Sequence, residues 1–508
     1  MSVWKGAIAL AAAWVIAFGG SAVAQNLRLP ESDVHNKRTN DYVEETPDAD
    51  YQHASPAALE AFRDIKYGIR IHWGIYSIVQ SQHTSWPFLE YSYQQKQDYQ
   101  QLYKTWNPKS FDADQWMKFF KDNGMRMFAM TTNHHDGFTM YDTKTRVKRR
   151  VNWTAPGGPV LEDCDLAYSI METPFHRDVI RELCDSGRKF GLKIDLYYSH
   201  PNWYDADFRP YCFHPVTTPD IKAHPELYAK SDIRKKKTAK DYMEAPDPTS
   251  EEAARMIARH RQQLTELLTN YGKIDMICLD MWLGKKNWPE IRETMKLLRK
   301  IQPDVMFRAR GIGNYGDYYT PEGFVPGSKE NTDMPWFVIY PLATDFAYDP
   351  DPAKYKGSRW IVNNLIDAVA KGGNFMVAIG PDADGVFHPK AVEQIEEAGR
   401  WIKVNASAIY DTRPRGGDDW HEGASVRFTR SKDNKTVYAI CLEHPGAQLT
   451  LKSVKPAAGS TITLLGNDKP LKWTCSAEQG LVIQMPTDLP AADAKPATLA
   501  WAFKIQID

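Results

Sequence analysis

The sequence predicts an α/β protein built as a (β/α)8-like barrel with a C-terminal β-sandwich domain. Short apolar runs alternate with amphipathic helical segments from about residue 57 to residue 414, which is typical of strand-helix units around a parallel sheet. The units number roughly seven to eight, which favours a closed barrel over an open sheet. After residue 414 the chain changes to short stretches separated by turn residues, so residues 415–508 are predicted to form the β-sandwich.

Residues 1–24 have the pattern of a secretory signal peptide. Lys5 precedes an apolar run at residues 7–18, and a small-residue Ala-Val-Ala motif ends at Ala24, before Gln25. The run is too short to span a bilayer. We therefore expect cleavage near Ala24-Gln25, a secreted or periplasmic mature protein, and a polar lead-in segment at residues 25–56.

The composition indicates which partners the protein is expected to bind. Lys+Arg 63 against Asp+Glu 64 leave a net charge of -1, which argues against nucleic acid. The 16 Trp and 25 Tyr supply flat apolar faces that suit stacking on sugar rings. The 6 Cys are scattered and form no CxxC pair, so no disulfide scaffold is predicted. We expect no cofactor and no membrane span, and the sequence carries no signal for the oligomeric state.

The barrel region is expected to alternate between strands and helices. Strands are expected at residues 67–76, 125–132, 192–198, 274–279, 305–307 and 374–380. Helices are expected at residues 112–122, 177–190, 250–270, 289–301, 358–371 and 389–404. Ser250 is the expected N-cap of its helix. A polar, lysine-rich insertion at residues 205–248 and a loop-rich region at residues 311–352 interrupt the alternation.

Polar and aromatic side chains follow the expected strands or lie in the loops beyond them. They are His72, Trp73, His134, His135, Tyr197, Tyr198, His200, Asp280, Trp282, Arg310 and Glu322. The carboxyl ends of parallel strands meet at one face of a barrel, so we expect these side chains to lie together there. Two carboxylates among histidines and aromatic rings suit glycoside hydrolysis, in which one carboxylate attacks the anomeric carbon and the other protonates the leaving oxygen. Histidines and tyrosines would hold the sugar hydroxyls, and tryptophans would form an apolar wall.

Two other uses of these residues are open. His72, His134, His135 and Asp280 are all residue types that bind divalent metals. However, adjacent histidines at a strand end point to opposite sides, and no HxH or HExxH spacing is present, so no metal is expected. A non-catalytic sugar-binding protein is the second alternative, and it would be favoured if either carboxylate proved dispensable.

Several longer motifs occur in order between residues 57 and 414. They are KYGIRIHWGIYS (66–77), TTNHHDGF (131–138), GLKIDLYYS (191–199), YGKIDMICLD (271–280), GDYYTPE (316–322), KGGNFMVAIGPDADG (371–385) and AIYDTRP (408–414). Together they resemble the α-L-fucosidases of glycoside hydrolase family 29, which also have a C-terminal β-sandwich. The resemblance implies an exo-acting, retaining hydrolase that releases L-fucose from oligosaccharides or glycoconjugates through a covalent glycosyl-enzyme.

The resemblance also implies roles for individual residues. The family's nucleophile matches Asp280. Its fucose-binding residues match His72, His134, His135, Tyr197 or Tyr198, and Arg310. Glu90 is a weaker match to the glutamate of an EWY-like motif, because Tyr91 and Ser92 follow it here.

The acid/base residue varies across the family. In some members it is the glutamate of a T-x-E motif, which matches Glu322. In others it lies in a later P-W-E motif, but this chain has Phe337 at the position of that glutamate. The resemblance therefore favours Glu322, with Glu330 as the reserve.

The chain departs from the family's pattern near the sugar subsite. Asn133 precedes the HHDG motif where lysine is common, and Met281 follows Asp280 where many members have glycine. These changes leave the linkage and aglycone open, and α-L-galactosides or non-catalytic fucose binding are the alternatives. The insertion at residues 205–248 is expected to build the aglycone side.

Overall fold

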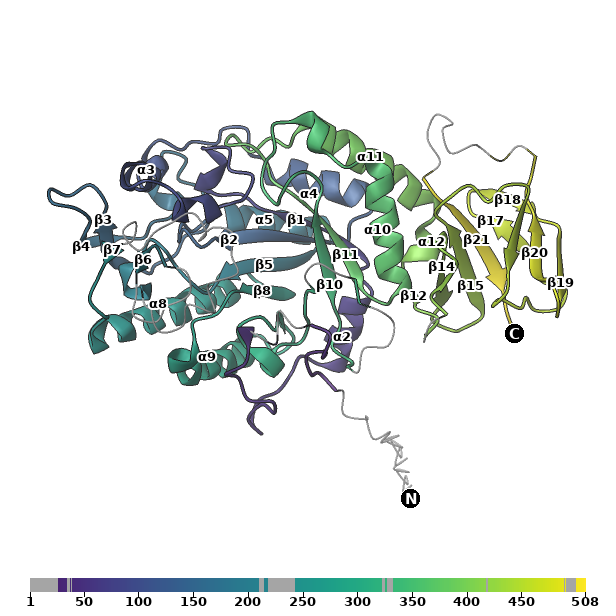
Figure 1. Ribbon diagram of the computed structural model, residues 1–508, viewed down its shortest axis with the longest axis horizontal. Coiled ribbons are helices and arrows are strands. Elements are labelled where there is room, and N and C mark those ends of the chain that lie inside the picture. Colours follow the sequence, from purple (N-terminus) through teal and green to yellow (C-terminus); the bar gives the residue numbers. More distant parts are fainter. Residues whose placement is uncertain are drawn as a thin grey trace, which may run out of the picture.

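The structure is a computed structural model that describes residues 26–33, 37, 39–209, 214–217, 243–321, 325–326, 332–416, 419–487, 489 and 499–508. The predicted signal peptide, Glu322, Glu330 and most of the 205–248 insertion lie outside these residues. Figure 1 shows an α/β part at one end of the long axis and the C-terminal sheets at the other. Within the described ranges, no helix has the length and apolar character needed to cross a membrane.

A curved parallel sheet forms the centre of the α/β part, in the order β10-β11-β1-β2-β5-β8-β9. Its strands are β1 (Tyr67–Ile71), β2 (Met127–Asn133), β5 (Lys193–Ser199), β8 (Met276–Asp280), β9 (Met306–Phe307), β10 (Phe337–Pro341) and β11 (Asn374–Ile379). Every neighbouring pair is parallel. The strand residues are almost all buried, as expected for a parallel sheet that helices cover.

A short segment at Tyr318 and Tyr319 joins the two edges of this sheet. Tyr318 bridges to Arg308, directly after β9, and Tyr319 bridges to Trp336, directly before β10; both bridges are parallel. The Ala309 N–H donates to the Tyr318 carbonyl at 2.8 Å. The sheet therefore continues around as a (β/α)8-like barrel, and the predicted fold class is confirmed.

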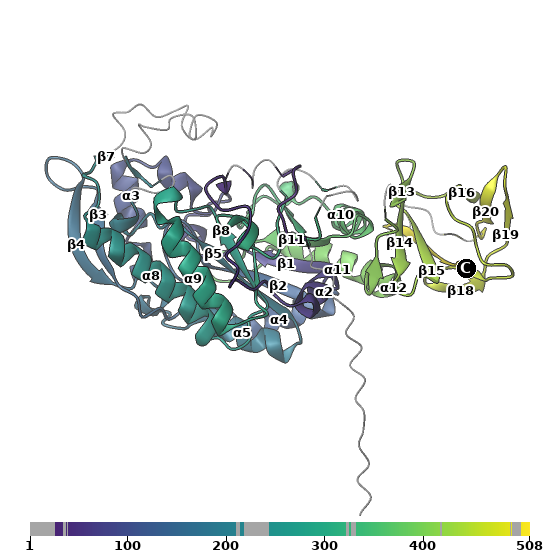
Figure 2. The same cartoon turned by 90° about the horizontal axis from the view of Figure 1, so that it is seen from below.

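Helices surround the barrel (Figures 1 and 2). They are α2 (Pro56–Arg63), α4 (Ala113–Asp122), α5 (Val179–Lys189), α8 (Ser250–Thr269), α9 (Trp288–Ile301), α10 (Ser358–Ala370) and α11 (Pro389–Val404). The short helices α3 (Tyr93–Tyr99) and α12 (Ala406–Ile409) lie outside this set. The N-cap of α8 is Thr249, which forms a capping box with Glu252, so the expectation of Ser250 was one residue late.

Irregular segments account for the other differences from the sequence prediction. β1 ends at Ile71, and a 3-10 turn, η1 (Ile75–Ser77), replaces the expected end of that strand. The loop-rich region contains β10, which was not predicted, because its short apolar run lies between Pro335 and Pro341. Two small two-stranded sheets are insertions in the barrel. In one, β3 (Val147–Asn152) pairs antiparallel with β4 (Val160–Leu166), and in the other, β6 (Val216–Thr217) pairs parallel with β7 (Met243–Glu244).

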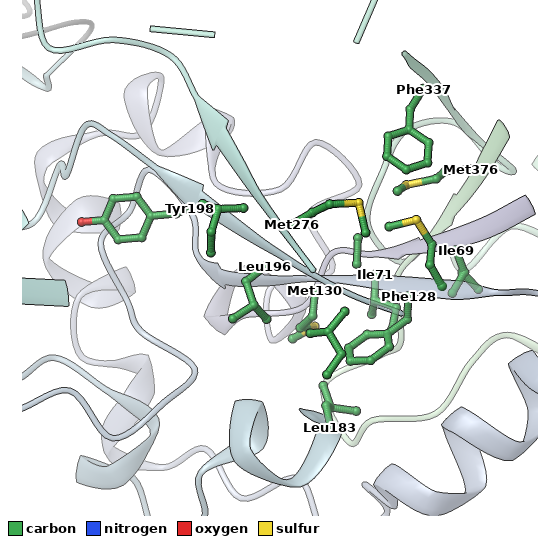
Figure 3. Close-up of a cluster of buried hydrophobic side chains, with 14 of the residues drawn as sticks. Ile69, Ile71, Phe128, Met130, Leu183, Leu196, Tyr198, Met276, Phe337 and Met376 are labelled. Atoms are coloured by element: carbon green, nitrogen blue, oxygen red, sulfur yellow. The ribbon is translucent and has the colours of Figure 1, made fainter. Parts of the chain in front are cut away.

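The barrel core is a continuous cluster of buried apolar side chains (Figure 3). It includes Ile69, Ile71, Phe128, Met130, Leu183, Leu196, Met276, Phe337 and Met376. Helix α5 approaches the sheet closely through Gly187. A Cβ atom at position 187 would lie 2.4 Å from Cε1 of Phe128, so glycine is needed for this contact.

The C-terminal part contains two antiparallel sheets. Its strands are β12 (Thr412–Arg413), β13 (His421–Glu422), β14 (Val426–Ser431), β15 (Thr436–Cys441), β16 (Gln448–Leu451), β17 (Ile462–Leu464), β18 (Asn467–Pro470), β19 (Trp473–Ser476), β20 (Gly480–Gln484) and β21 (Trp501–Gln506). One sheet has the order β12-β14-β15-β21-β17-β18, with β13 on β14, and the other has the order β16-β20-β19. Phe428 and Phe503 of the first share a core with Leu451 and Ile483 of the second, as predicted for a β-sandwich.

Side chains tie this domain to the barrel helices. Arg427 Nε donates to Asp367 of α10 at 2.8 Å, and the Trp401 indole of α11 donates to the Ala500 carbonyl at 2.8 Å. The sandwich therefore packs on the side of the barrel formed by α10 and α11, away from the strand ends that carry the predicted site residues (Figure 1).

The contact between Gly187 and Phe128 makes a prediction about stability. Ala is a better helix former than Gly by about 1 kcal/mol, but overpacking costs about 1–3 kcal/mol. Gly187→Ala is therefore expected to lower the free energy of unfolding, measured by urea denaturation. The double variant Gly187→Ala with Phe128→Leu should cost less than the sum of the two single variants. Strict additivity would show that the two residues do not compete for space.

Candidate active site

Asp280 is the last residue of β8, and its carboxylate lies among cationic and hydroxyl donors. Oδ1 accepts from Arg308 Nη1 at 3.2 Å and from Arg310 Nη1 at 2.9 Å. Oδ2 accepts from the Tyr197 hydroxyl at 2.7 Å. Nε2 of His135 lies 3.5 Å from Oδ2. The Asp280 carboxylate at the end of β8 is thus surrounded by groups from β5, from the loop after β2 and from the segment after β9.

These donors keep Asp280 ionised although it is only 9% exposed. Burial alone would raise the pKa of the Asp280 carboxyl. The guanidinium groups of Arg310 and Arg308, the ring of His135 and the Tyr197 hydroxyl act in the opposite direction and hold the pKa well below its usual range. A carboxylate that stays charged near neutral pH can act as a nucleophile.

Three buried histidines stand around this carboxylate. His72 follows β1, and His134 and His135 follow β2. The ring centroids of His134 and His135 are 4.4 Å apart, and His72 lies 6.1 Å from His134. The His134 ring stacks on Tyr197 with an interplanar angle of 7°. The structure therefore brings together the three histidines, Tyr197 and Asp280, all of which the sequence placed in the site.

The three imidazoles are neutral near pH 7. Burial lowers the pKa of His135 to about 4 and holds those of His72 and His134 well below the usual value. Nδ1 of His72 and both ring nitrogens of His135 have no hydrogen-bond partner within the described part of the chain. A neutral imidazole offers one donor and one acceptor, so these rings suit the hydroxyl groups of a sugar.

Two guanidinium groups and a second carboxylate lie in the barrel beneath the site. Arg70 Nη2 is 3.2 Å from Asp195 Oδ2, and its Cζ lies 5.5 Å from the centre of the Tyr197 ring. Arg308 Nη1 also reaches Cys278 Sγ at 3.5 Å. Burial raises the pKa of Asp195 to about 6, although Arg70 opposes the effect. The interior below Asp280 is therefore polar and strongly coupled by charge.

Sequence reasoning missed several residues of the site. Ser85 Oγ lies 2.5 Å from Nδ1 of His134. The partly exposed Trp86 ring packs 4.9 Å from His135, and the partly exposed Phe346 ring packs 5.1 Å from His72. These residues come from irregular loops after β1 and β10, where no periodic pattern marks them. Arg308 directly follows the strand expected at residues 305–307, but it was not among the predicted site residues.

Other predicted site residues lie elsewhere. Trp73 is fully buried, donates from Nε1 to the Asp382 carbonyl at 2.9 Å and packs against Trp106. Tyr198 donates to Gln263 of α8 at 2.9 Å, and Figure 3 shows its ring directed away from the barrel cluster. Strand neighbours point to opposite faces, which separates Trp73 from His72 and Tyr198 from Tyr197.

The remaining predictions have simpler outcomes. Glu90 follows the 3-10 helix η2 (Trp86–Leu89) and is exposed. In this part of the chain, Ser85 and Trp86 are the residues that contact the histidines. Trp282 is partly exposed, two residues beyond Asp280. Among the described residues, no group of three or more His, Cys, Asp or Glu is arranged to hold a metal ion.

A barrel that presents an ionised carboxylate among neutral histidines at its carboxyl-terminal face has the architecture of a glycoside hydrolase. Residues 32–407 match the family described as Alpha-L-fucosidase, and residues 421–506 match the Alpha-L-fucosidase C-terminal domain. The chain therefore belongs to the α-L-fucosidase family, glycoside hydrolase family 29.

Individual relatives cover nearly the whole chain. The plasma alpha-L-fucosidase of Pongo abelii is 26% identical over 445 residues, which cover 84% of this chain and 85% of the relative. Alpha-L-fucosidase isoenzyme 1 from Paenibacillus thiaminolyticus matches with a TM-score of 0.69 and 24% identity, covering 89% of this chain and 99% of that one. A trapped covalent intermediate of a family 29 enzyme from Bacteroides thetaiotaomicron matches with a TM-score of 0.67 and 21% identity, covering 91% and 98%.

The hydrogen bond from Tyr197 to Asp280 predicts a pH-dependent contribution to stability. The folded-state pKa of Asp280 lies below its unfolded value of about 4, so contacts to the carboxylate stabilise the fold above that pH. They are lost as the pH falls through the folded-state pKa. Tyr197→Phe should therefore cost about 1.5–3 kcal/mol at pH 7, and the cost should shrink below pH 4.

Tyr198→Phe is the matched control for this measurement. Its hydroxyl donates to the neutral amide of Gln263, so its cost should be the same at each pH. Urea unfolding of both variants, from pH 7 to the lowest pH at which the protein is folded, makes the comparison. A cost for Tyr197→Phe that does not change with pH would contradict the proposed charge on Asp280.

Proposed function

We propose that the protein is an exo-acting α-L-fucosidase that retains anomeric configuration, with Asp280 as the nucleophile and Glu322 as the acid/base. The observation that carries the proposal is the ionised Asp280 carboxylate, which is bound by Arg310 and Tyr197 beside neutral histidines. Membership of the α-L-fucosidase family supports fucose as the sugar, and the trapped covalent intermediate of a relative supports the two-step mechanism.

In the first step, the Asp280 carboxylate attacks the anomeric carbon, and the bond to the leaving oxygen breaks. Glu322 gives its proton to that oxygen. The resulting glycosyl ester is then attacked by a water that has lost its proton to Glu322. Arg308 and Arg310 stabilise the carboxylate before attack and after its release, and His72, His134 and His135 hold the sugar hydroxyls.

The assignment of Glu322 is supported by the path of the chain before it. Tyr318 and Tyr319 form parallel bridges with Arg308, directly after β9, and with Trp336, directly before β10, so the chain runs from there towards the carboxyl-terminal face, where Asp280 lies. Glu322 comes three residues after Tyr319 in the sequence. Phe337, at the alternative position, is buried at the start of β10 and packs on Phe62, with ring centres 4.5 Å apart. A retaining enzyme needs its two carboxyl groups about 5 Å apart.

Replacement of the nucleophile tests the central assignment. Asp280→Ala should lower kcat on an aryl α-L-fucoside by about 10³-fold or more. Azide, which is small enough to enter the space left by the carboxylate, should restore turnover and give the β-fucosyl azide. Asp384→Ala, which removes an exposed carboxylate, serves as the control and should leave activity unchanged. Activity in Asp280→Ala at the wild-type level would end the assignment.

Leaving-group dependence tests the acid/base. Glu322→Ala should slow natural fucosides by about 10²–10⁴-fold, whereas a fucoside with an activated aryl leaving group needs little protonation and should lose much less in its first step. Glu330→Ala provides the comparison and should show no such difference between substrates. If Glu330→Ala shows the leaving-group pattern and Glu322→Ala does not, Glu330 is the acid/base.

A further inference from the structure

A pair of buried histidines lies directly behind Asp280, outside the set of groups that contact its carboxylate. His200 follows the last residue of β5, and His260 lies on α8. His200 is 2% exposed and His260 is not exposed at all. Nδ1 of His200 is 2.9 Å from Nε2 of His260, and the two rings stack with an interplanar angle of 18°. The reaction described above does not use either imidazole.

His200 contacts the backbone on both sides of the ion pair. The backbone N–H of His200 donates to the Asp280 backbone carbonyl at 3.0 Å. Its ring lies against Gly311, the residue after Arg310, where a Cβ atom would come within 3.0 Å of Cδ2 and 3.1 Å of Nε2. The same Cβ would lie 2.5 Å from the Met281 carbonyl, and Gly311 has a φ of +81°. Glycine is therefore required where the backbone that carries Arg310 passes the His200 ring.

The contact between the two imidazoles constrains the position of their protons. Burial lowers the pKa of His200 to about 4 and holds that of His260 well below its usual value, so both rings are neutral near pH 7. A neutral imidazole has one N–H and one lone pair. If His260 donates from Nε2, then His200 accepts at Nδ1 and carries its own proton on Nε2, the atom that faces the backbone at Gly311.

The backbone of Arg310 agrees with this arrangement. It opposes the effect of burial on the pKa of His200 and favours a proton on the ring. Nε2 of His200 and Nδ1 of His260 have no hydrogen-bond partner among the described residues. The proton on Nε2 is thus directed at the segment from Arg310 to Gly311.

We propose that His260 and His200 form a positioning pair, in which His260 orients the His200 ring, and the ring packs against Gly311 and fixes the backbone that carries Arg310, so that the Arg310 guanidinium stays on Asp280. The proposal rests on the proposed role of Asp280 as nucleophile. Both histidines act through Arg310 and not through the sugar. Loss of the pair moves Arg310 relative to Asp280, and misplacement by about 1 Å in an active site can cost 100-fold in rate.

Three substitutions test the pair. His200→Leu removes the polar atoms at similar volume, His200→Gln keeps a side-chain N–H near the position of Nε2, and His260→Leu removes the partner. We expect His200→Leu and His260→Leu to lower kcat on an aryl α-L-fucoside by about 10- to 100-fold, with a smaller change in KM. We expect His200→Gln to retain most of the activity.

The acidic limb of the pH profile of kcat/KM distinguishes a loss of positioning from a smaller amount of folded protein. A displaced Arg310 no longer holds down the pKa of Asp280, so this limb should move to higher pH in both leucine variants. Tyr198→Phe, which alters the same contact between β5 and α8, should leave kcat and the limb unchanged. Activity is expressed per folded molecule, with the folded fraction taken from thermal melting.

Wild-type kcat and an unmoved acidic limb in either leucine variant, per folded molecule, would overturn the positioning role. If one leucine variant does not fold, the other decides. The Asp280→Ala measurement distinguishes this failure from failure of the proposed function. If Asp280→Ala is inactive while His200→Leu behaves as wild type, only the positioning pair is wrong; if Asp280→Ala is active, the nucleophile itself is wrong.

Discussion

Asp280 keeps its negative charge although it is buried, because two guanidinium groups lie within hydrogen-bond distance of one of its oxygens. An isolated carboxylate at this depth would take up a proton, since burial penalises the charged form. Arg308, Arg310 and the Tyr197 hydroxyl reverse that preference. Replacing one partner of such a buried pair leaves the other charge uncompensated, at a typical cost of about 3–5 kcal/mol. The charge on Asp280 and the placement of the two arginines therefore depend on each other.

The barrel supplies the geometry that this ion pair needs. Asp280 pairs in register with Ser199 of β5, so Tyr197, two residues earlier, faces the same side of the sheet and reaches Oδ2. β9 is only two residues long and brings Arg308 and Arg310 to the adjacent edge. β5, β8 and β9 are fixed by their neighbours in the buried sheet and by the helices that cover it. The loops after β1 and β10 bring Trp86 and Phe346 to the histidines. The charged centre is thus on rigid strands, and its aromatic surroundings are on loops.

The parts of the site on strands were predictable from the sequence. Apolar runs that end in HHDG or in CLD place His134, His135 and Asp280 at one edge of a parallel sheet, and the structure places them there. Strand alternation decided what the sequence left open: Tyr197 faces Asp280 and Tyr198 faces α8. Ser85, Trp86 and Phe346 could not be predicted, because their loops are held by contacts between distant residues, such as Gln82 with Asp349 at 3.2 Å. β10 was missed because only a short apolar run between two prolines marks it.

The most direct test of the account is to identify the atom that carries the sugar during turnover. A 2-fluoro-fucosyl fluoride should form a long-lived ester, because the fluorine at C2 slows both steps while the fluoride leaving group at C1 keeps formation of the ester faster than its hydrolysis. Mass spectrometry of a proteolytic digest should then find one 2-fluoro-fucosyl group on the peptide that contains Asp280, and Asp280→Ala should carry none. A label on another carboxylate would contradict the account, and so would fucose released with inverted anomeric configuration.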